Sequence, residues 1–204
     1  MDVIKKVNSV QRAKKRKTWR IINDVQRRLL SKRKLVFNGE VNFGMAEYTK
    51  EAFDTLLSEG GPDIEVHITS SGGEVTYGLI IYDILSGYPG KIDGLVIGGA
   101  KSMAAVILQA CTRRMATTHS KILIHHISRR QISLDTLRDK RKLREFIDHM
   151  ERSQARLYRI LAARTSKSIA EIKKDCRKDE DMDAEEAIRF GLLDSIFTGK
   201  IKIS

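Results

Sequence analysis

The chain has 204 residues, of which 41% are hydrophobic and 31% charged, so it can bury a core and is not a disordered chain. The longest apolar runs, such as Met103–Leu108, are far shorter than the roughly 18 residues that a membrane-spanning helix needs. No apolar segment of a secretory signal stands at the N-terminus. Two cysteines, Cys111 and Cys176, cannot by themselves form a disulfide framework or a zinc site. We therefore expect a cytoplasmic protein with no membrane contact.

The positive charge is concentrated at the N-terminus. Residues 1–34 contain thirteen Lys and Arg against two Asp, a net +11 of the total +12, and the other 170 residues carry only +1. The densest run spans residues 12–17, and Trp19 is the only aromatic residue nearby. Such a basic arm suits contact with nucleic acid or with an acidic partner. A solvated tail is the competing interpretation, because a cluster of charges alone is a weak signal.

The hydrophobic spacing then predicts alternating helices and strands. Apolar residues from Trp19 to Leu30 recur at helical spacing and predict an amphipathic helix that joins the arm to the body. Strands are predicted over residues 34–37, 64–69, 94–97 and 121–124, and helices over residues 45–57, 76–85, 102–110 and 134–163. Capping boxes begin two further helices at Ser168 and Asp183, and Gly191 ends the second. This alternation is typical of an α/β fold with a largely parallel sheet.

Two of the predicted strands end in glycine-containing breaks that lead into helices. One break contains Gly72 and Gly73, and the other contains Gly98 and Gly99 shortly before Ser102. Both breaks can face one crevice, because ligands bind beyond the carboxyl ends of parallel strands. Backbone N–H groups from two such turns can form an oxyanion hole, with Ser102 beside it as a nucleophile. The alternative is that Ser102 only caps its helix.

A serine nucleophile needs a base and a carboxylate that orients the base. His125 and His126 end the strand predicted over residues 121–124, and the alternation of a strand points one of them toward the core and the other away. Lys101 is adjacent to Ser102 and is not expected to be the base, because neighbouring helix residues do not face each other. Spacing alone does not choose the acid from a cluster near the C-terminus, which contains Asp175, Asp179, Glu180, Asp181 and Asp183.

Taken in order, several motifs resemble the Clp protease proteolytic subunit, a family of serine peptidases. The resemblance runs from about residue 35 to residue 198. Its main pieces are Ile68-Thr69-Ser70-Ser71-Gly72-Gly73-Glu74-Val75-Thr76-Tyr77-Gly78, Ile81-Tyr82-Asp83, Ala100-Lys101-Ser102-Met103-Ala104, Ile124-His125-His126 and Gly191-Leu192-Leu193-Asp194-Ser195-Ile196. Each piece is weak alone, but together, in this order, they are specific.

The resemblance implies a role for each residue that matches the family's motifs. Ser102 matches the nucleophile, His125 the general base and Asp179 the orienting acid. Gly73 and Met103 match the residues whose backbone N–H groups form the oxyanion hole. The implied chemistry is acyl transfer through an ester on Ser102, followed by hydrolysis. It implies no metal and no organic cofactor.

The resemblance also implies a fold and an assembly. The fold is a spiral of ββα units, shared with crotonases, from which a helical handle protrudes at about residues 128–165. The chain then divides into a basic arm and amphipathic helix over residues 1–34 and a peptidase domain over residues 35–204. Family members form heptameric rings, often two stacked face to face, and these rings enclose active sites that cleave peptides or unfolded proteins.

Some positions depart from the family pattern. Lys101 stands where alanine usually precedes the nucleophile, and residues 128–131 replace the customary glycine-rich strand, which helps to bind substrate and join rings. Glu65, His67 and Gly87 match positions at which apolar pockets dock an AAA+ unfoldase, a hexamer driven by ATP. These residues are poor linings for an apolar loop. We therefore expect a different partner or no unfoldase.

Three alternatives remain. Viral head-maturation proteases share the fold, and the basic arm would then be an assembly tether. A catalytically silent ring subunit or a nucleic-acid-binding structural protein would rely on the arm, although the intact Ser102, His125 and Asp179 argue against silence. An acyl-CoA enzyme of the crotonase type ranks last, because that chemistry uses no Ser-His-Asp triad.

Overall fold

The computed structural model of the chain describes residues 23–128 and 131–199. The basic run at residues 12–17 and Trp19 therefore lie outside the described residues, as do residues 129 and 130 of the segment that departs from the family pattern. Of the predicted amphipathic helix, the structure describes α2 (Asp24–Leu30). Its N-cap, Asn23, forms a capping box with Gln26. Leu30 is buried, whereas Val25 is 62% exposed, so only one edge of α2 packs on the body.

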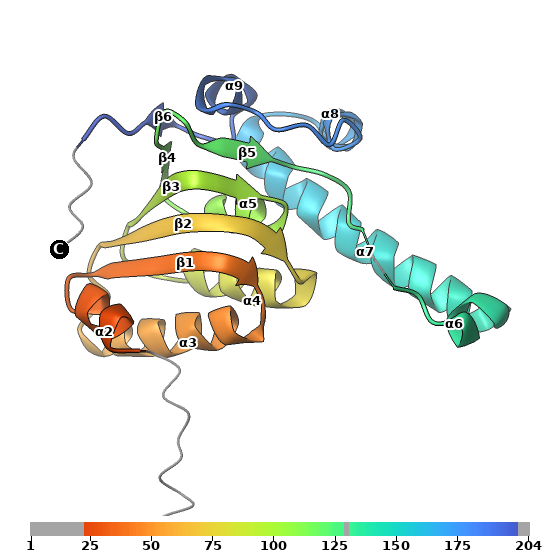
Figure 1. Cartoon of the computed structure of the whole chain (residues 1–204), viewed down its shortest axis with the longest axis horizontal. Coiled ribbons are helices and arrows are strands. Elements are labelled where there is room, and N and C mark those ends of the chain that lie inside the picture. Colours follow the sequence, from red (N-terminus) through yellow and green to blue (C-terminus); the bar gives the residue numbers. More distant parts are fainter. Residues whose placement is uncertain (1–22, 129–130, 200–204) are drawn as a thin grey trace, which may run out of the picture.

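The centre of the molecule is a parallel sheet (Figure 1). Its strands are β1 (Lys34–Val41), β2 (Ile64–Gly73), β3 (Ile92–Lys101), β4 (Arg113–Ala116), β5 (Lys121–Leu123) and β6 (Ser195–Ile196). The order across the sheet is β1-β2-β3-β4-β6. Strand β3 pairs with β4 through Asp93–Val96 and with β5 through Gly99–Lys101, so its two halves have different neighbours on one side.

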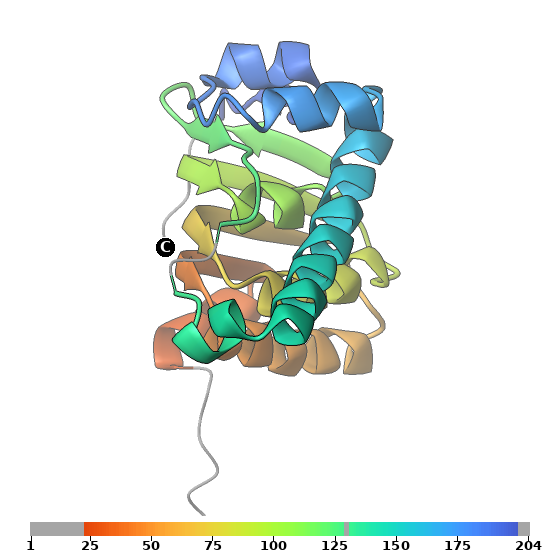
Figure 2. The ribbon, with the colours of Figure 1, turned by 90° about the vertical axis from the view of Figure 1, so that its right-hand side faces the viewer.

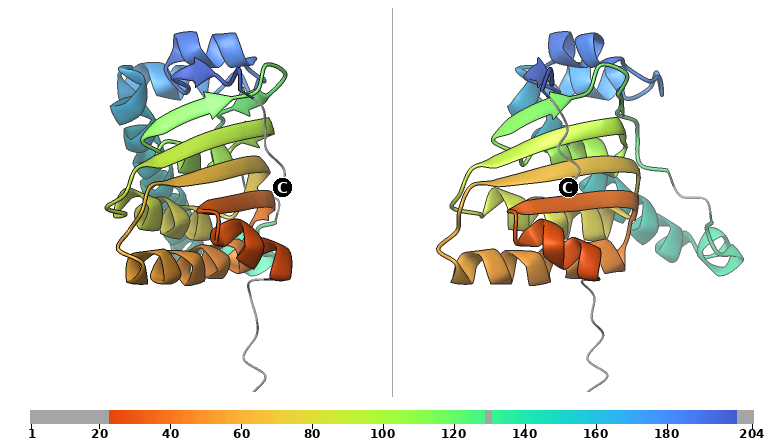
Figure 3. Two further views of the ribbon diagram at one scale, coloured as in Figure 1. Left: turned by 90° about the vertical axis from the view of Figure 1, so that its left-hand side faces the viewer. Right: turned by 60° about the vertical axis from the view of Figure 1, so that its left-hand side comes forward.

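Helices cover one face of the sheet and its C-terminal edge. They are α3 (Phe43–Ser58), α4 (Val75–Ser86), α5 (Met103–Leu108), α6 (Leu134–Arg138), α7 (Lys140–Thr165), α8 (Ile169–Asp175) and α9 (Ala184–Phe190). Figures 2 and 3 show α3, α4 and α5 on the same side of the sheet, with α7 running past them toward α8 and α9. The predicted parallel α/β architecture is therefore confirmed. Among the described residues, no helix is both long and apolar enough to cross a membrane.

Strands β1, β2 and β3 are longer than the sequence predicts, because they continue through the glycine-containing breaks instead of ending there. Strand β5 ends one residue earlier than predicted, and the short strands β4 and β6 were not predicted. The pairing of β1 with β2 shifts register after Asn38, and the pairing of β2 with β3 shifts after Ile68. A register shift lets a strand bend without leaving the sheet. The extended parts of β2 and β3 therefore approach each other beyond these shifts, at the edge where parallel α/β folds place their ligands.

Helix α5 is the centre of the core. Every residue from Met103 to Leu108 is at most 3% exposed, which agrees with its lack of any charged side chain. The helix packs against β2, β3 and α7. Because α5 is fully enclosed, its first turn has a fixed position relative to the ends of β2 and β3. A side chain at the start of α5 is therefore rigidly placed.

The handle differs from the single helix predicted over residues 134–163. Asp139 has an extended backbone (φ −95°, ψ 110°), and its carboxylate accepts hydrogen bonds from the N–H groups of Arg141 and Lys142. This cap starts a new helix, so α6 and α7 are separate, and α7 projects from the body (Figure 1). The predicted apolar stripe is buried only near the base of α7, at Leu157 and Leu161. Farther out, Ile147 is 45% exposed.

The helices after the handle start and stop where the sequence predicts. Ser168 and Asp183 each form a capping box, with Glu171 and Glu186. Gly191 ends α9 in a left-handed conformation at φ 95°. A side chain there would crowd the backbone of α7, because an added Cβ would lie 3.0 Å from the carbonyl oxygen of Thr165.

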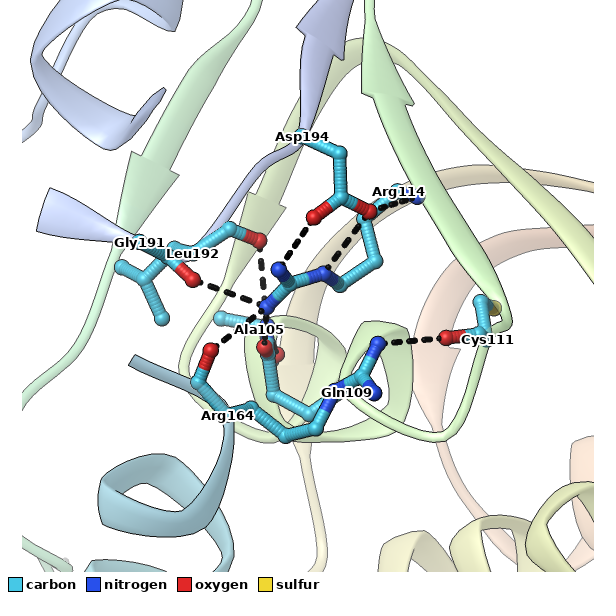
Figure 4. Close-up of polar contacts among 8 residues, drawn as sticks. All are labelled: Ala105, Gln109, Cys111, Arg114, Arg164, Gly191, Leu192 and Asp194. Carbon is cyan, nitrogen blue, oxygen red and sulfur yellow. Dashed lines mark hydrogen bonds and ion pairs between the residues drawn. The ribbon is translucent and has the colours of Figure 1, made fainter. Parts of the chain in front are cut away.

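A buried arginine fastens these C-terminal elements to the sheet (Figure 4). The side chain of Arg114 is 7% exposed and pairs with Asp194. Its guanidinium also donates to the side chain of Gln109 (2.7 Å) and to the carbonyl oxygens of Arg164 (3.2 Å) and Gly191 (2.8 Å). Burial raises the pKa of Asp194, but the hydrogen bonds from Arg114 outweigh it and hold that pKa below its usual range. The C-terminal ends of α5, α7 and α9 thus meet at the guanidinium of Arg114.

Candidate active site

Ser102 occupies a strained turn between β3 and α5. Its backbone angles are φ 54° and ψ −122°, in a region that side-chain-bearing residues rarely adopt and that costs about 1–3 kcal/mol. The side chain makes no capping hydrogen bond to α5. The interpretation of Ser102 as a simple helix cap is therefore wrong. The serine hydroxyl is therefore not used to cap α5, which leaves it available as a nucleophile.

The glycine pair of β2 lies against this turn. A Cβ on Gly72 would be 2.6 Å from Cβ of Ser102 and 2.7 Å from the carbonyl oxygen of Lys101. A Cβ on Gly73 would be 2.3 Å from the carbonyl oxygen of Val41. Both glycines also have positive φ, at 90° and 153°. Neither position tolerates a side chain, so the two glycines are required for β2 to approach the serine.

Two backbone N–H groups flank the serine. Met103 is the first residue of α5, where an N–H group has no acceptor within the helix and where the helix dipole is positive. Gly73 lines the same pocket as Ser102 and Met103. A developing negative charge near Ser102 would therefore meet a helix start and a glycine backbone. This places both predicted oxyanion-hole residues beside the predicted nucleophile.

The backbone ties the predicted base to the same turn. The N–H of Ser102 donates to the carbonyl oxygen of Leu123 at 2.8 Å, two residues before His125. His125 lines the pocket with Ser102. His126 points elsewhere, because its Nδ1 lies 2.6 Å from the hydroxyl of Tyr158 on α7. The two histidines therefore have different surroundings, but the predicted strand alternation is wrong as its cause, because β5 ends at Leu123 and both histidines are half-buried in the segment that follows it.

The predicted acid is close to His125 but loosely held. Nδ1 of His125 lies 3.7 Å from Oδ1 of Asp179, and the Asp179 side chain is 68% exposed. That distance exceeds a hydrogen bond. Asp179 also has a positive φ of 50°. Within the described part of the chain, Ser102 makes no side-chain hydrogen bond to His125. The residues of the predicted triad are gathered at one site, but they are not connected by hydrogen bonds.

Other members of the acidic cluster have different contacts. Asp175 pairs with Lys178 at 2.8 Å, and Asp183 caps α9. Asp181 accepts from Lys101, whose Nζ lies 2.7 Å from Oδ2. Lys101 is thus bound to a carboxylate, which agrees with the expectation that it is not the base. Sequence reasoning did not find this pair, because its members are 80 residues apart and no short-range pattern links them.

The pocket beside Ser102 is lined by both polar and apolar residues. Besides the catalytic candidates, its lining includes Gln154 and Ser128 and a larger set of apolar side chains, Val75, Val106, Ile124, Ile127, Leu157 and Leu161. Gln154 accepts from the N–H of Ile127 at 2.5 Å, which holds the segment after His125 against α7. Within the described ranges, no group of three or more His, Cys, Asp or Glu side chains could hold a metal ion.

A strained serine at a helix start, beside glycine N–H groups and a histidine, is the arrangement of a serine hydrolase. Comparison with known proteins makes this more specific. The family model described as Clp protease matches residues 15–200. The chain is 32% identical over 183 residues to the ATP-dependent Clp protease proteolytic subunit of Ligilactobacillus salivarius (strain UCC118). The matched region covers 88% of this chain and 90% of that protein. The chain therefore belongs to the Clp protease family, has its α/β fold, and is a peptidase of the serine type.

Proposed function

We propose that the chain is an endopeptidase in which Ser102 attacks the peptide carbonyl. His125 accepts the proton of the serine hydroxyl and then gives it to the leaving amine, and Asp179 orients His125. The backbone N–H groups of Gly73 and Met103 stabilise the negative oxygen of the tetrahedral intermediate. Water activated by His125 then hydrolyses the ester on Ser102.

The conformation of Ser102 is the observation that carries this proposal. A serine at φ 54° and ψ −122° has no local reason to be strained, since it does not cap α5. Strain of this kind persists where the surrounding structure requires it, and it concentrates at functional sites. Here the surroundings are Gly72, the Leu123 carbonyl and buried α5.

The 3.7 Å separation between His125 and Asp179 is compatible with this mechanism. Catalytic hydrogen bonds are often long in proteins without substrate and shorten when the substrate binds. The same separation also favours the competing proposal of a catalytically silent subunit. Activity measurements distinguish the two, because only the first predicts turnover.

The substrate side chain next to the cleaved bond is proposed to be apolar. Six aliphatic side chains line the pocket that contains Ser102 and His125, and among the lining residues that the structure describes there is no lysine, arginine or carboxylate. Burying a charged group there would cost free energy without a compensating partner. Peptides with Leu or Met before the cleaved bond should therefore react faster than peptides with Lys or Asp at that position.

We propose that the chain works within a ring of identical subunits, single or stacked. Family membership supports an oligomeric assembly, and the exposed apolar residues of the handle, such as Leu134 and Leu137, suit contacts between copies. The relative from Ligilactobacillus salivarius is named as ATP-dependent. In this chain, Glu65 pairs with Lys34 and His67 on the sheet. That charged cluster supports a partner other than an unfoldase with apolar docking loops.

The experiment is hydrolysis of fluorogenic peptides by the full chain, with the sedimenting mass of the assembly measured in the same buffer. We expect turnover from particles of seven or fourteen copies, and none after Ser102→Ala. Particles of the right mass that hydrolyse no peptide would contradict the peptidase proposal and favour the silent subunit. Co-purification with the host's ATP-driven unfoldases, stoichiometric and dependent on ATP, would overturn the expectation of a different partner.

A further inference from the structure

Within the described residues, one ion pair connects β3, which leads directly into Ser102, to the loop that carries Asp179. Lys101 directly precedes Ser102, and its Nζ lies 2.7 Å from Oδ2 of Asp181, two residues after Asp179. The side chain of Lys101 folds back over Gly99, where an added Cβ would lie 3.9 Å from Cε of Lys101. Residues 99 and 101 share a face of β3, and at this distance an added Cβ would be in ordinary van der Waals contact with the lysine.

The loop has two other attachments, one on each side of Asp179. On its C-terminal side, Met182 and Ile122 exchange backbone hydrogen bonds of 2.8 and 2.9 Å, so the chain is fixed to β5. On its N-terminal side, Lys178 pairs with Asp175 at 2.8 Å within a turn at the end of α8. The first attachment reaches the nucleophile's turn only through β5, where Ile122 pairs with Ala100 and the carbonyl oxygen of Leu123 accepts from the N–H of Ser102. The Lys101 pair is a direct side-chain contact between the residue before Ser102 and the loop.

Asp179 itself has little to hold it in place. Its side chain is 68% exposed, and its only ion pair or hydrogen bond within the described residues is the 3.7 Å contact with His125. Its backbone has a positive φ of 50°, which a nonglycine residue adopts at a cost. The position of the carboxylate relative to His125 therefore depends on how the loop is tethered.

We propose that the ion pair of Lys101 with Asp181 is a positioning device, which holds the loop so that Asp179 can orient His125. This inference rests on the proposed function of Ser102, His125 and Asp179. Lys101 and Asp181 do not line the pocket of Ser102, so they act through Asp179 and not on the substrate. The pair is about one-third exposed at both ends, so its contribution to folding stability is small.

A competing explanation is that Lys101 acts by its own charge, one residue from Ser102. The two explanations differ for Asp181→Asn, which keeps the lysine charge and removes the ion pair. The positioning role predicts that Lys101→Met and Asp181→Asn each lower kcat by about tenfold with KM unchanged, since misplacing a catalytic group by about 1 Å can cost up to about a hundredfold. A direct charge effect predicts a loss for Lys101→Met only.

The test compares Lys101→Met and Asp181→Asn with the double variant and with two variants designed to restore the ion pair. The double variant should be no slower than either single variant, because the pair acts as a unit. Lys101→Arg should keep most of the activity, and the swapped pair Lys101→Asp with Asp181→Lys should recover part of it. Lys142→Met is the matched control, since Lys142 and Asp135 form a similar exposed pair at 2.5 Å in the handle, and it should change kcat by less than about twofold.

Amide hydrogen exchange of residues 178–182 provides the second readout, which does not depend on activity. Exchange in this loop should quicken in Lys101→Met and in Asp181→Asn and stay unchanged in Lys142→Met. Unaltered exchange in both Lys101→Met and Asp181→Asn would overturn the positioning role. So would a double variant whose loss of kcat equals the product of the two single losses. A wild-type chain that hydrolyses nothing contradicts the proposed function instead, and the exchange result still decides whether the tether exists.

Discussion

The two halves of the active site are built in different ways. The half around Ser102 is fixed by steric contact and backbone hydrogen bonds, since Gly72 and Gly73 leave no space for a side chain and α5 is buried. The half around Asp179 is an exposed loop, held by surface ion pairs and one backbone bridge. In the proposed mechanism, the nucleophile and the oxyanion hole are thus in place before substrate binds, whereas the alignment of the acid can change.

This difference has an energetic basis. Moving Ser102 would require disruption of a close-packed core, in which even one methylene group is felt. Moving Asp179 requires only the exchange of exposed ion pairs, each worth about 0–1 kcal/mol. Regulation of such a site, by substrate or by assembly, is therefore expected to act on the histidine and acid side. Four substitutions test this contrast, from the largest expected effect to the smallest.

Ser102→Ala should abolish turnover, with a loss of at least about ten-thousandfold in kcat, because the nucleophile itself is removed. The variant keeps the backbone and nearly all packing, so its stability should change by less than about 0.5 kcal/mol. Peptide hydrolysis and thermal unfolding measure the two effects. Residual turnover near the wild-type rate would remove Ser102 from the mechanism.

Gly73→Ala should cause the next largest loss, about a hundredfold or more in kcat, because the added Cβ lies 2.3 Å from the Val41 carbonyl and displaces an oxyanion-hole donor. Gly99→Ala is the matched control, since its nearest neighbour would be 3.4 Å away. If both variants lost activity equally, the close approach of β2 would not be what matters.

Asp179→Asn should cost less than Gly73→Ala, about tenfold to a hundredfold in kcat, because its side chain is exposed and its contact with His125 is long. His125→Ala, which removes the base, should be far worse. The kcat values of the two variants, measured with one peptide, decide the order. An Asp179→Asn loss as large as that of His125→Ala would show that the acid is as firmly placed as the base.

His126→Gln should have the smallest effect on activity at neutral pH, because His126 contacts Tyr158 and not the pocket. Burial, aided by the charges of Arg177 and Lys173, lowers the pKa of His126 below 6.5. The unfolded chain therefore binds this proton first, and wild-type stability is lost as the pH falls through and below 6.5. Urea unfolding at several pH values should show a flatter slope for His126→Gln in that range, and an unchanged slope would contradict this account.

Much of this arrangement could be predicted from the sequence. The first glycine break located the crevice, since Gly73 lines the pocket, whereas Gly98 and Gly99 do not. The helix predicted from residue 102 placed Ser102 at its start. These features depend on residues close together in the chain, where hydrophobic spacing and glycine content are informative.

What the sequence could not show depends on distant residues. Strand β4 begins with Arg113 and Arg114, which look like surface residues, and Arg114 is buried only because Asp194 pairs with it across 80 positions. Helices α6 and α7 are separated at Asp139, which caps α7. Because Asp139 stands within a run of charged residues, the sequence pattern does not identify it as a helix cap. Spacing could not choose among the five acidic residues, and only the family resemblance selected Asp179. The pairing of Lys101 with Asp181 required the folded chain.

The most direct test of the central claim is labelling of the full chain with a fluorophosphonate, followed by mass mapping of the modified residue. The probe reacts with an activated serine and needs no knowledge of the natural substrate. We expect one modified residue, Ser102, and loss of labelling in His125→Ala. An assembled particle that is not labelled at Ser102 would contradict the claim that its strained turn holds a nucleophile.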